Sequence, residues 1–372
     1  MIPITKLLNA SSACVLAALV LAPTAIAAPE AAPGFTVSAF ATAPETVPAT
    51  TGADDIAGLG GNVFVGWQNG VGTKGEPNSS TGQTAGTVVE YDPAGQVLGT
   101  WSLTGKIDGL GGDPARGRLI ATVNEDGNSS LYTITPSAPA AQQVRHYTYS
   151  PAPDSGTSGG VLTGGGTDAV TVHGGQIYLS ASNPTPENAT ALFHVHLDNA
   201  THTASLAPTY ADNAIATDAA TGESVKLALT DPDSNANVPL SSPRFAGQLV
   251  LAAQGDKQLV FARRIQGDEP QLTRLALTKE AQPAGVDDVR WSAGQTGRLL
   301  VVDRGAGTIY SVTGPFLGGE PFGSLDTVGE AEQHNEVERV DLRSGAMTPF
   351  ITGLSAGKGL LWLPSPASED QG

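Results

Sequence analysis

Four aspartates recur at matching positions in four short segments of the chain. After each of them comes a turn rich in glycine or polar residues, and then an apolar run such as the one that begins at Val63. The four residues are Asp55, Asp108, Asp168 and Asp288. Carboxylates that recur once in each structural repeat come together in space, where they can hold a cation, act as general bases or bind a ligand.

Extending the alignment adds two cationic residues to this ring of carboxylates. Arg244 would take the fourth place and Lys358 the sixth. Within the ring, Asp288 and Asp55 are the predicted catalytic carboxylates. The alternative, which stays open at this point, is that each aspartate only accepts backbone N–H bonds from a neighbouring turn and recurs because the turn recurs.

Polar residues that follow the second strand of each repeat supply the other candidates. They would lie on the same face as the aspartates, because successive strands of a meander alternate in direction. Carboxylate and amide oxygens suit a divalent cation such as Ca²⁺, and the predicted metal ligands are Asp108, Asn124, Asn183 and Asp303. The predicted ligand-binding residues are Trp67, Asn69, Glu125, Asp168, Arg244, Asp256 and Arg304. We expect no organic cofactor.

Two further motifs contribute less to the predicted site. Residues 231–237 alternate oxygen-bearing side chains like the start of a calcium loop, but they lack its sixth-position glycine and its twelfth-position acid. We predict that they form a polar lid loop. His194 and His196 alternate along a strand without a third nearby ligand, which favours a solvated strand face over a metal site.

The elements that must position these residues are short strands. Strand signals separated by turns recur at about 40–50 residues, which is typical of a β-propeller, and no sustained helical periodicity appears. We predict an all-β chain with a single propeller at residues 35–365, most simply of six four-stranded blades, preceded by a loose leader at 28–34 and followed by a tail at 366–372.

The ends of the propeller can be assigned with more detail. The segment 35–42 reads as a strand that closes the propeller by pairing with the C-terminal part of the chain. A fourth inner strand is expected near 242–246 or earlier. A fifth inner strand is expected to begin at Val286, and the apolar run from Leu299 follows it in the same repeat. Three long connections, at 68–85, 150–166 and 211–241, are expected on the binding face, because long loops without a function are uncommon.

The N-terminal segment indicates export. Lys6 precedes an apolar stretch, and Ala25-Ile26-Ala27 is an A-x-A cleavage signal, so residues 1–27 are predicted to be a signal peptide. Cys14 is the only cysteine of the chain, and the mature protein would contain none. A secreted or periplasmic location follows from this segment. The formal charge of -17 argues against nucleic acid and anionic membranes as partners, and we expect a monomer.

The repeated Asp followed by an apolar strand resembles the six-bladed propeller group, which includes the senescence-marker/gluconolactonase, NHL-repeat and TolB-like families. The resemblance covers most of the mature chain at the level of repeats. It implies a divalent cation at the axis, held by one Glu, by Asn side chains and by an Asp. Asn124, Asn183 and Asp303 occupy compatible strand ends, and Asp55 stands where the family has Glu.

Three classes of function are compatible with these features. The first is an exported propeller that binds a small ligand, with or without a divalent cation, on its axial top face. The second is a metal-dependent hydrolase of the lactonase or esterase type, in which a cation polarises the carbonyl group and an Asp acts as base. The third is a protein-interaction scaffold. Whether the protein is an enzyme is left open at this stage.

Overall fold

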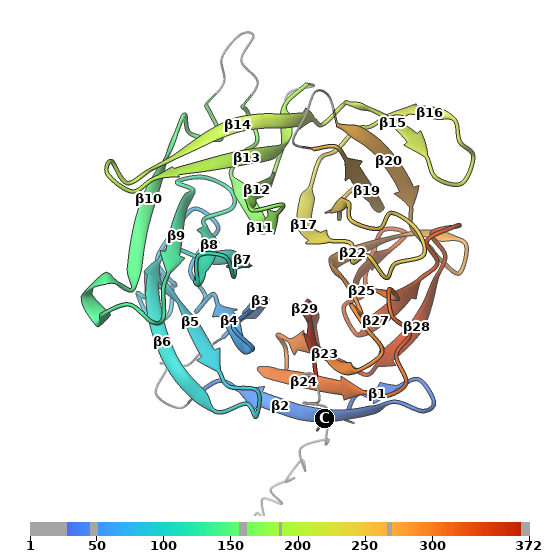
Figure 1. Ribbon diagram of the computed structural model, residues 1–372, viewed down its shortest axis with the longest axis horizontal. Helices are drawn as coiled ribbons and strands as arrows, with labels where there is room; N and C mark the ends of the chain where they lie inside the picture. Colours follow the sequence, from blue (N-terminus) through green and yellow to red (C-terminus); the bar gives the residue numbers. More distant parts are fainter. Residues whose placement is uncertain (1–27, 45–50, 156–161, 186–187, 266–269, 366–372) are drawn as a thin grey trace, which may run out of the picture.

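The computed structural model describes residues 28–44, 51–155, 162–185, 188–265 and 270–365. Strands in these residues are arranged like blades around a central axis (Figure 1). The one helix among them is a single 3₁₀ turn, η1 (Ala140–Gln142). The all-β class and the propeller arrangement predicted from the sequence are therefore confirmed. The predicted signal peptide and C-terminal tail lie outside the described residues.

Three four-stranded meanders follow one another along the chain. The first contains β3 (Ala53–Leu59), β4 (Asn62–Trp67), β5 (Ala85–Tyr91) and β6 (Val97–Thr104). The second contains β7 (Ile107–Asp113), β8 (Arg118–Val123), β9 (Ser130–Ile134) and β10 (Val144–Ser150). The third contains β11 (Thr167–His173), β12 (Gln176–Ala181), β13 (Thr190–Asp198) and β14 (Thr203–Ala211). Because β10 and β14 pair in parallel, the second and third meanders form one eight-stranded sheet.

The fourth meander corrects two expectations. It contains β17 (Pro232–Asn237), β18 (Leu249–Ala253), β19 (Gln258–Arg263) and β20 (Gln271–Ala276), and it is extended by β15 (Ile215–Asp218) and β16 (Ser224–Lys226). The segment 211–241 is therefore not one long loop, because it contains the strands β15, β16 and β17. Its polar stretch, which was predicted as a lid loop, contains the inner strand β17. This strand lies next to the axis and comes earlier in the chain than residues 242–246.

Two further sheets are interleaved along the chain. After β22 (Gln282–Trp291) the chain forms the hairpin of β23 (Gly297–Asp303) and β24 (Thr308–Thr313), and β23 pairs with the last strand, β29 (Gly357–Pro364). The chain then returns to pair β25 (Pro321–Val328) with β22, followed by β27 (Glu336–Val340) and β28 (Met347–Thr352). The expectation that the strand from Val286 and the apolar run from Leu299 belong to one repeat is wrong, since β22 pairs with β25 and the run from Leu299 pairs with β29 in the neighbouring sheet.

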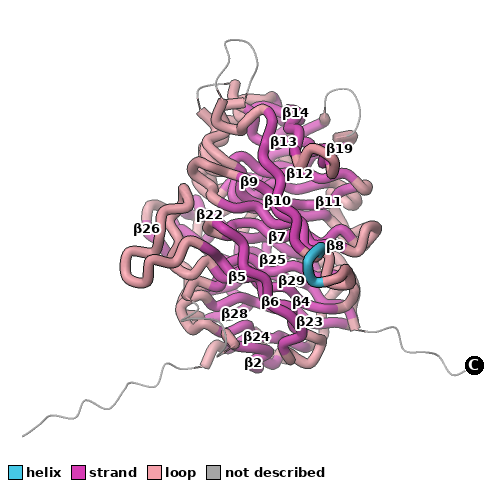
Figure 2. The backbone as a smooth tube through the Cα atoms, turned by 90° about the vertical axis from the view of Figure 1, so that its left-hand side faces the viewer, coloured by secondary structure: helices cyan, strands magenta, loops and turns pink. Residues whose placement is uncertain are grey.

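The N-terminal part of the described chain closes the molecule. β2 (Thr36–Thr42) pairs with β24, which confirms the predicted closure by residues 35–42. The leader predicted as loose contains β1 (Glu30–Ala31), which pairs with β28. Two other short strands, β21 (Thr278–Lys279) and β26 (Ala331–Glu332), also extend the sheet of β22, and the segment around β26 projects from the side of the molecule (Figure 2).

The core lies between the sheets. Every residue of β18 is buried, because adjacent sheets cover both of its faces, whereas β6 at the rim alternates between exposed and covered residues. The innermost strands contact their neighbours in the order β3, β7, β11, β17, β22 and β29, and β29 contacts β3 again. No helix among the described residues is long and apolar enough to cross a bilayer.

Candidate functional site

A shift of register occurs at the same level in each innermost strand. In β3, for example, Ala53 and Ile56 pair with β4 and the two residues between them do not, and the other five strands show corresponding interruptions. Such bulges re-aim side chains. The first residues inside the interruptions are Asp54, Asp108, Asp168, Asp233, Asp287 and Lys358, and we call these six residues the axial ring.

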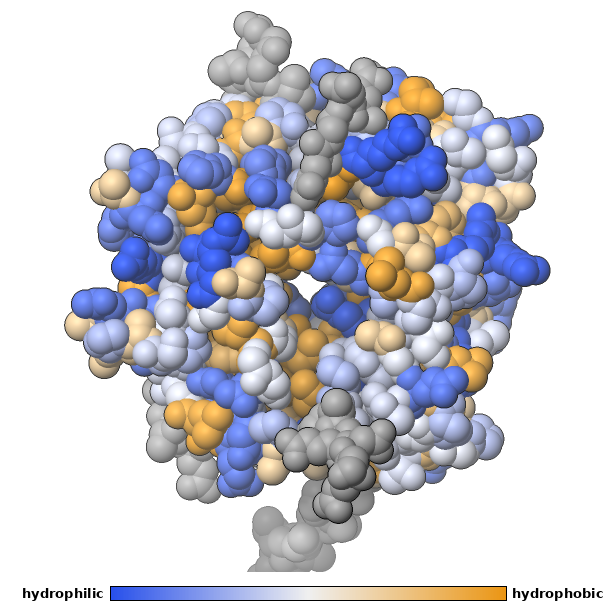
Figure 3. Space-filling model, in the orientation of Figure 1, coloured by the Kyte–Doolittle hydropathy of each residue, from blue (hydrophilic) through white to orange (hydrophobic). Residues whose placement is uncertain are grey.

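All six residues of the axial ring line one cavity of about 580 Å³. A second cavity of about 910 Å³, with more apolar walls, shares Leu110, Val170 and Arg290 with the first. These residues therefore lie where the two cavities adjoin. An opening is visible at the centre of the face in Figure 3.

The register corrects the alignment of the repeated aspartates. Asp55 and Asp288 each fall one residue after the axial ring, so Asp54 and Asp287 are the equivalents of Asp108. The Asp55 carboxylate accepts the N–H of Leu110 at 2.5 Å, and the Asp288 carboxylate accepts the N–H of Leu360 at 2.7 Å. Both bonds tie an inner strand to its neighbour. This is the supporting role that the sequence left open, and both residues also line the cavity.

The structure agrees with the sequence alignment at the sixth place of the ring and differs from it at the fourth. Lys358 occupies the sixth place, as predicted. Asp233 occupies the fourth place and Arg244 does not, since the Arg244 guanidinium stacks on Phe245 at 4.7 Å and donates to the carbonyl oxygen of Leu342 at 2.7 Å. The sequence alignment missed Asp233 because the polar segment 231–237 was predicted to be a loop, whereas it contains the inner strand β17.

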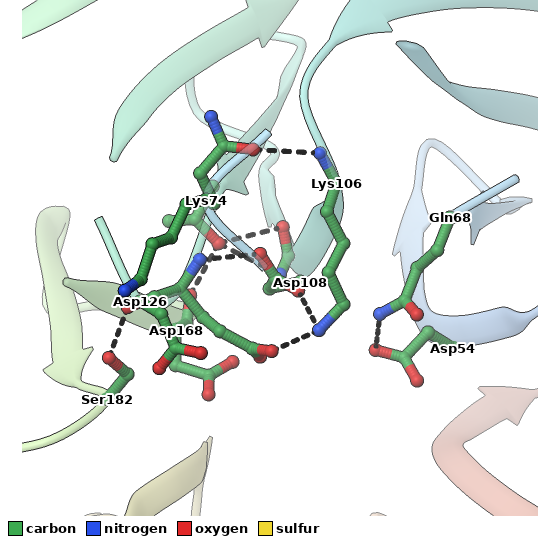
Figure 4. A network of polar contacts seen from close by, with 12 residues as sticks. Asp54, Gln68, Lys74, Lys106, Asp108, Asp126, Asp168 and Ser182 are labelled. Atoms are coloured by element: carbon green, nitrogen blue, oxygen red, sulfur yellow. Dashed lines mark hydrogen bonds and ion pairs between the residues drawn. The ribbon is translucent and has the colours of Figure 1, made fainter. Parts of the chain in front are cut away.

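Three members of the axial ring have cationic partners. Asp54 pairs with Arg304 at 2.8 Å and accepts a hydrogen bond from the Gln68 amide at 2.7 Å. Asp108 pairs with Lys106 at 2.9 Å, and Asp287 pairs with Lys358. Lys106 also contacts Glu125, so that its ammonium group lies between two carboxylates (Figure 4).

The other two carboxylates of the ring have no such partner. No described residue donates a hydrogen bond to the side chain of Asp168 or of Asp233, or forms an ion pair with it, although Asp168 is only 6% exposed and faces the cavity (Figure 4). Nearby Asn235 is 2% exposed, and its Oδ1 accepts no hydrogen bond from the described residues. The ring is therefore compensated on one side and uncompensated on the other.

Burial and mutual repulsion raise the pKa values of the cavity carboxyls. Burial is the largest cause throughout, and it raises the pKa of Asp168 and Asp233 well above the usual value, with neighbouring carboxylates adding to the effect. The pKa of Asp231 rises to about 6, chiefly by burial and by the charge of Asp256. Burial and the charge of Asp288 raise the pKa of Asp55 to about 8.

Seven predicted site residues line the cavity. They are Asp55, Asp108, Glu125, Asp168, Asn183, Asp288 and Arg304. Residues that line it and were not predicted include Asp54, Gln68, Lys106, Asp231, Asp233 and Asp287. The doublets 54–55 and 287–288 offered a signal for two of these, because either aspartate of a doublet can point to the axis.

Six predicted residues lie outside the cavity lining: Trp67, Asn69, Asn124, Arg244, Asp256 and Asp303. Trp67 belongs to the core and is fully buried. The other polar residues support local structure: Asp303, for example, accepts the N–H groups of Ala306, Ser355 and Ala356. Asn69 donates to the carbonyl oxygen of Ala85, and Asp256 accepts the N–H of Thr230.

The predicted set of metal ligands does not fit a single ion. Asp108 and Asn183 line the cavity, whereas Asn124 accepts the N–H of Lys106 at 2.9 Å and Asp303 supports a turn. No group of three or more His, Cys, Asp or Glu side chains in the described part of the chain is arranged to hold a metal ion.

No known protein family and no curated protein matches the sequence. Solved structures with a similar arrangement include a protein of unknown function from Bacteroides caccae (10% sequence identity, covering 84% of this chain and 86% of that one, TM-score 0.45). They also include the periplasmic gluconolactonase PpgL of Pseudomonas aeruginosa (13% sequence identity, covering 84% of this chain and 89% of that one, TM-score 0.47). A third is the β-propeller domain of Cps50 from Myceliophteria thermophila (12% sequence identity, covering 84% of this chain and 97% of that one, TM-score 0.39). A gluconolactonase and another β-propeller are thus among the solved structures to which this chain is similar, and at these identities the likeness concerns the arrangement of strands alone.

Proposed function

We propose that the protein is an exported β-propeller of six four-stranded blades that binds a small polar molecule in its axial cavity. The observation that carries this proposal is the axial ring, in which six bulges direct charged side chains toward one cavity of about 580 Å³. Cavities of about 300–1,000 Å³ are typical of small-molecule sites. A purely structural channel would not require a charged residue at the same bulge of every inner strand.

A ligand-binding test follows from the position of Asn183. This exposed residue lines the cavity and donates to Asp126 at 2.7 Å, so Asn183→Trp places a bulky group at its edge. We expect a thermal-shift screen of sugars, sugar acids, amines and amino acids to identify ligands of the wild-type protein that bind Asn183→Trp at least about tenfold more weakly. Thr201→Trp, on an exposed turn outside the cavity lining, is the control and should bind as the wild type does. Equal affinities in the wild type and Asn183→Trp would contradict the proposal.

Hydrolysis of a lactone or ester is the second candidate, and the Asp55–Asp288 pair favours it. The pKa of Asp55 is raised to about 8, by burial and then by the charge of Asp288, so Asp55 holds a proton at neutral pH and lies beside a second carboxyl group. Such a pair can act as general acid and general base. Adding lactones and esters to the screen and measuring the release of acid distinguishes this candidate from binding alone. An enzyme releases acid in many turnovers per protein molecule, whereas a binding protein releases none.

Export is proposed from the sequence of residues 1–27. We expect the protein recovered from the periplasm or medium to begin near Ala28, because Ala25-Ile26-Ala27 forms an A-x-A cleavage signal. Intact-mass spectrometry of that material measures the N-terminus directly. Exported protein that retains Met1 would contradict cleavage, and protein confined to the cytoplasm would contradict export.

A further inference from the structure

The distribution of positive charge around the axial ring is uneven. Arg304, Lys106 and Lys358 compensate the carboxylates of Asp54, Asp108 and Asp287, respectively. The compensated carboxylates come from β3, β7 and β22. The uncompensated ones come from β11 and β17, which are adjacent inner strands. One sector of the cavity wall therefore carries two carboxyl groups with which no described cation forms an ion pair.

Asp168 is the strongest evidence that this sector faces a ligand. Its side chain is 6% exposed, faces the cavity, and receives no hydrogen bond from the described residues. A buried carboxylate without a partner is unfavourable, because it loses its hydration and gains nothing in return. The carboxylates of Asp54, Asp108 and Asp287, at equivalent bulges, all have cationic partners, so the fold can supply such a partner, and none of the described residues supplies one here.

Asn235 provides a second, uncharged indication at the same wall. It lies two residues after Asp233 on β17, and its Nδ2 donates to the carbonyl oxygen of Ala169, next to Asp168, at 3.1 Å. Its Oδ1 is buried and accepts no hydrogen bond from the described residues. Asp168, Asp233 and Asn235 therefore present three acceptor groups without matching donors, and a primary ammonium group carries three donors and no acceptor.

We propose that the ligand of the axial cavity is a small organic cation, and that its primary ammonium group binds between Asp168 and Asp233 with Asn235 as a further acceptor. The inference rests on the proposed function, since it names the chemical class that the cavity takes. The ammonium group occupies the place that Lys106 and Lys358 occupy beside their own aspartates. The remainder of the ligand lies in the same cavity, whose wall also includes Gln254 and Ser182.

An organic cation fits this sector better than a metal ion does. No three acidic or histidine side chains of the described chain are arranged to hold a metal. A divalent cation would need six or more oxygen ligands at short distance, whereas an ammonium group needs three acceptors at hydrogen-bond distance. The two carboxylates also favour the ammonium through charge-assisted hydrogen bonds.

The test compares matched pairs of probes that differ by one amino group. Glucosamine is titrated against glucose, and ethanolamine against ethylene glycol, with the wild-type protein and with Asp168→Asn. We expect each amine to bind at least about tenfold more tightly than its hydroxyl counterpart, and Asp168→Asn to weaken amine binding about tenfold to a hundredfold, as expected for the loss of a charge-assisted hydrogen bond. The readouts are isothermal titration calorimetry and the shift in melting temperature.

Two controls separate recognition of the ammonium from general effects of charge and folding. Asp198→Asn removes the same charge from the turn between β13 and β14, where Asp198 accepts the N–H of Ala200, and it should leave amine binding unchanged. Asp168→Asn should melt no lower than the wild type without ligand, because no described residue donates a hydrogen bond to the carboxylate that it removes. If Asp198→Asn weakens binding equally, the effect is the field of the whole acidic surface, and the proposed site is wrong.

The remaining outcomes distinguish this inference from the proposed function. Tight binding of glucose or another neutral compound, lost in Asn183→Trp and unchanged in Asp168→Asn, would overturn the ammonium site and keep the cavity as the binding site. Saturable stabilisation by CaCl₂, reversed by EDTA and not matched by any amine, would replace the organic cation with a metal ion. Failure of every probe class to bind the wild-type protein would overturn both proposals.

Discussion

Replacing Phe322 with alanine is expected to lower the free energy of unfolding by about 3–5 kcal/mol, the range for removal of a fully buried aromatic ring. Phe322 is 0% exposed and lies on β25, with its ring 4.6 Å from that of Phe350 and 5.8 Å from that of Phe316. Its cluster also contains Trp362 from β29, so the cavity left by the substitution would loosen both interleaved sheets. Denaturant unfolding followed by tryptophan fluorescence measures the change.

Leu317 provides the control for this prediction. It lies five residues earlier in the chain and is 66% exposed, so Leu317→Ala should change the free energy of unfolding by less than about 0.5 kcal/mol. Similar losses in the two variants would mean that the aromatic cluster does not join the sheets as described.

Stability should fall as the pH rises from 5 to 8.5, because several cavity carboxyls have raised pKa values. A carboxyl whose pKa is higher in the folded than in the unfolded protein contributes stability that is fully present below the unfolded pKa and is lost as the pH rises through the folded pKa. For Asp55 this window runs from 3.8 to about 8. With Asp231 and Asp287, whose pKa values rise to about 6, the loss amounts to a few kcal/mol, or several degrees in melting temperature.

Other titrating groups leave the sign of this prediction unchanged. Asp198 and Asp341 have lowered pKa values, through hydrogen bonds to their carboxylates, and the stability that they contribute is lost only at a pH below 3.8. His146 has a pKa lowered by burial and acts in the opposite direction below pH 6.5, but its side chain is largely exposed and its effect is small.

Asp168→Asn tests the origin of the pH dependence. Burial and neighbouring carboxylates raise the pKa of Asp168, so this variant should lose less stability than the wild type between pH 5 and 8.5. Asp198→Asn should keep the wild-type slope. Melting temperatures of the wild type and both variants, measured by circular dichroism across this pH range, give the three slopes. A wild-type protein that becomes more stable with rising pH would contradict the prediction and show that the cavity carboxyls are ionised at little cost in stability.

The sequence by itself determined the local features of this protein. Short apolar runs bounded by turn residues identified strands such as β8 and β12, because a strand covered on both faces must be apolar along its length. The phase of the repeats also located Asp108, Asp168 and Lys358 at the axis, since the residue that begins an inner strand faces the axis whenever the strand keeps its place in the repeat.

Only the tertiary structure decided which strands pair and which residue of each bulge faces the axis. The hairpin β23–β24 follows β22 in the chain and yet pairs with β29, because register and partner are set by long-range packing that leaves no mark on local periodicity. In the same way, a bulge turns Asp54 and Asp287 toward the cavity and leaves Asp55 and Asp288 to bind neighbouring strands. The polar composition of 231–237 indicated a loop, but the segment contains β17, in which Ser234 and Asn235 are buried and Asp233 lines the cavity.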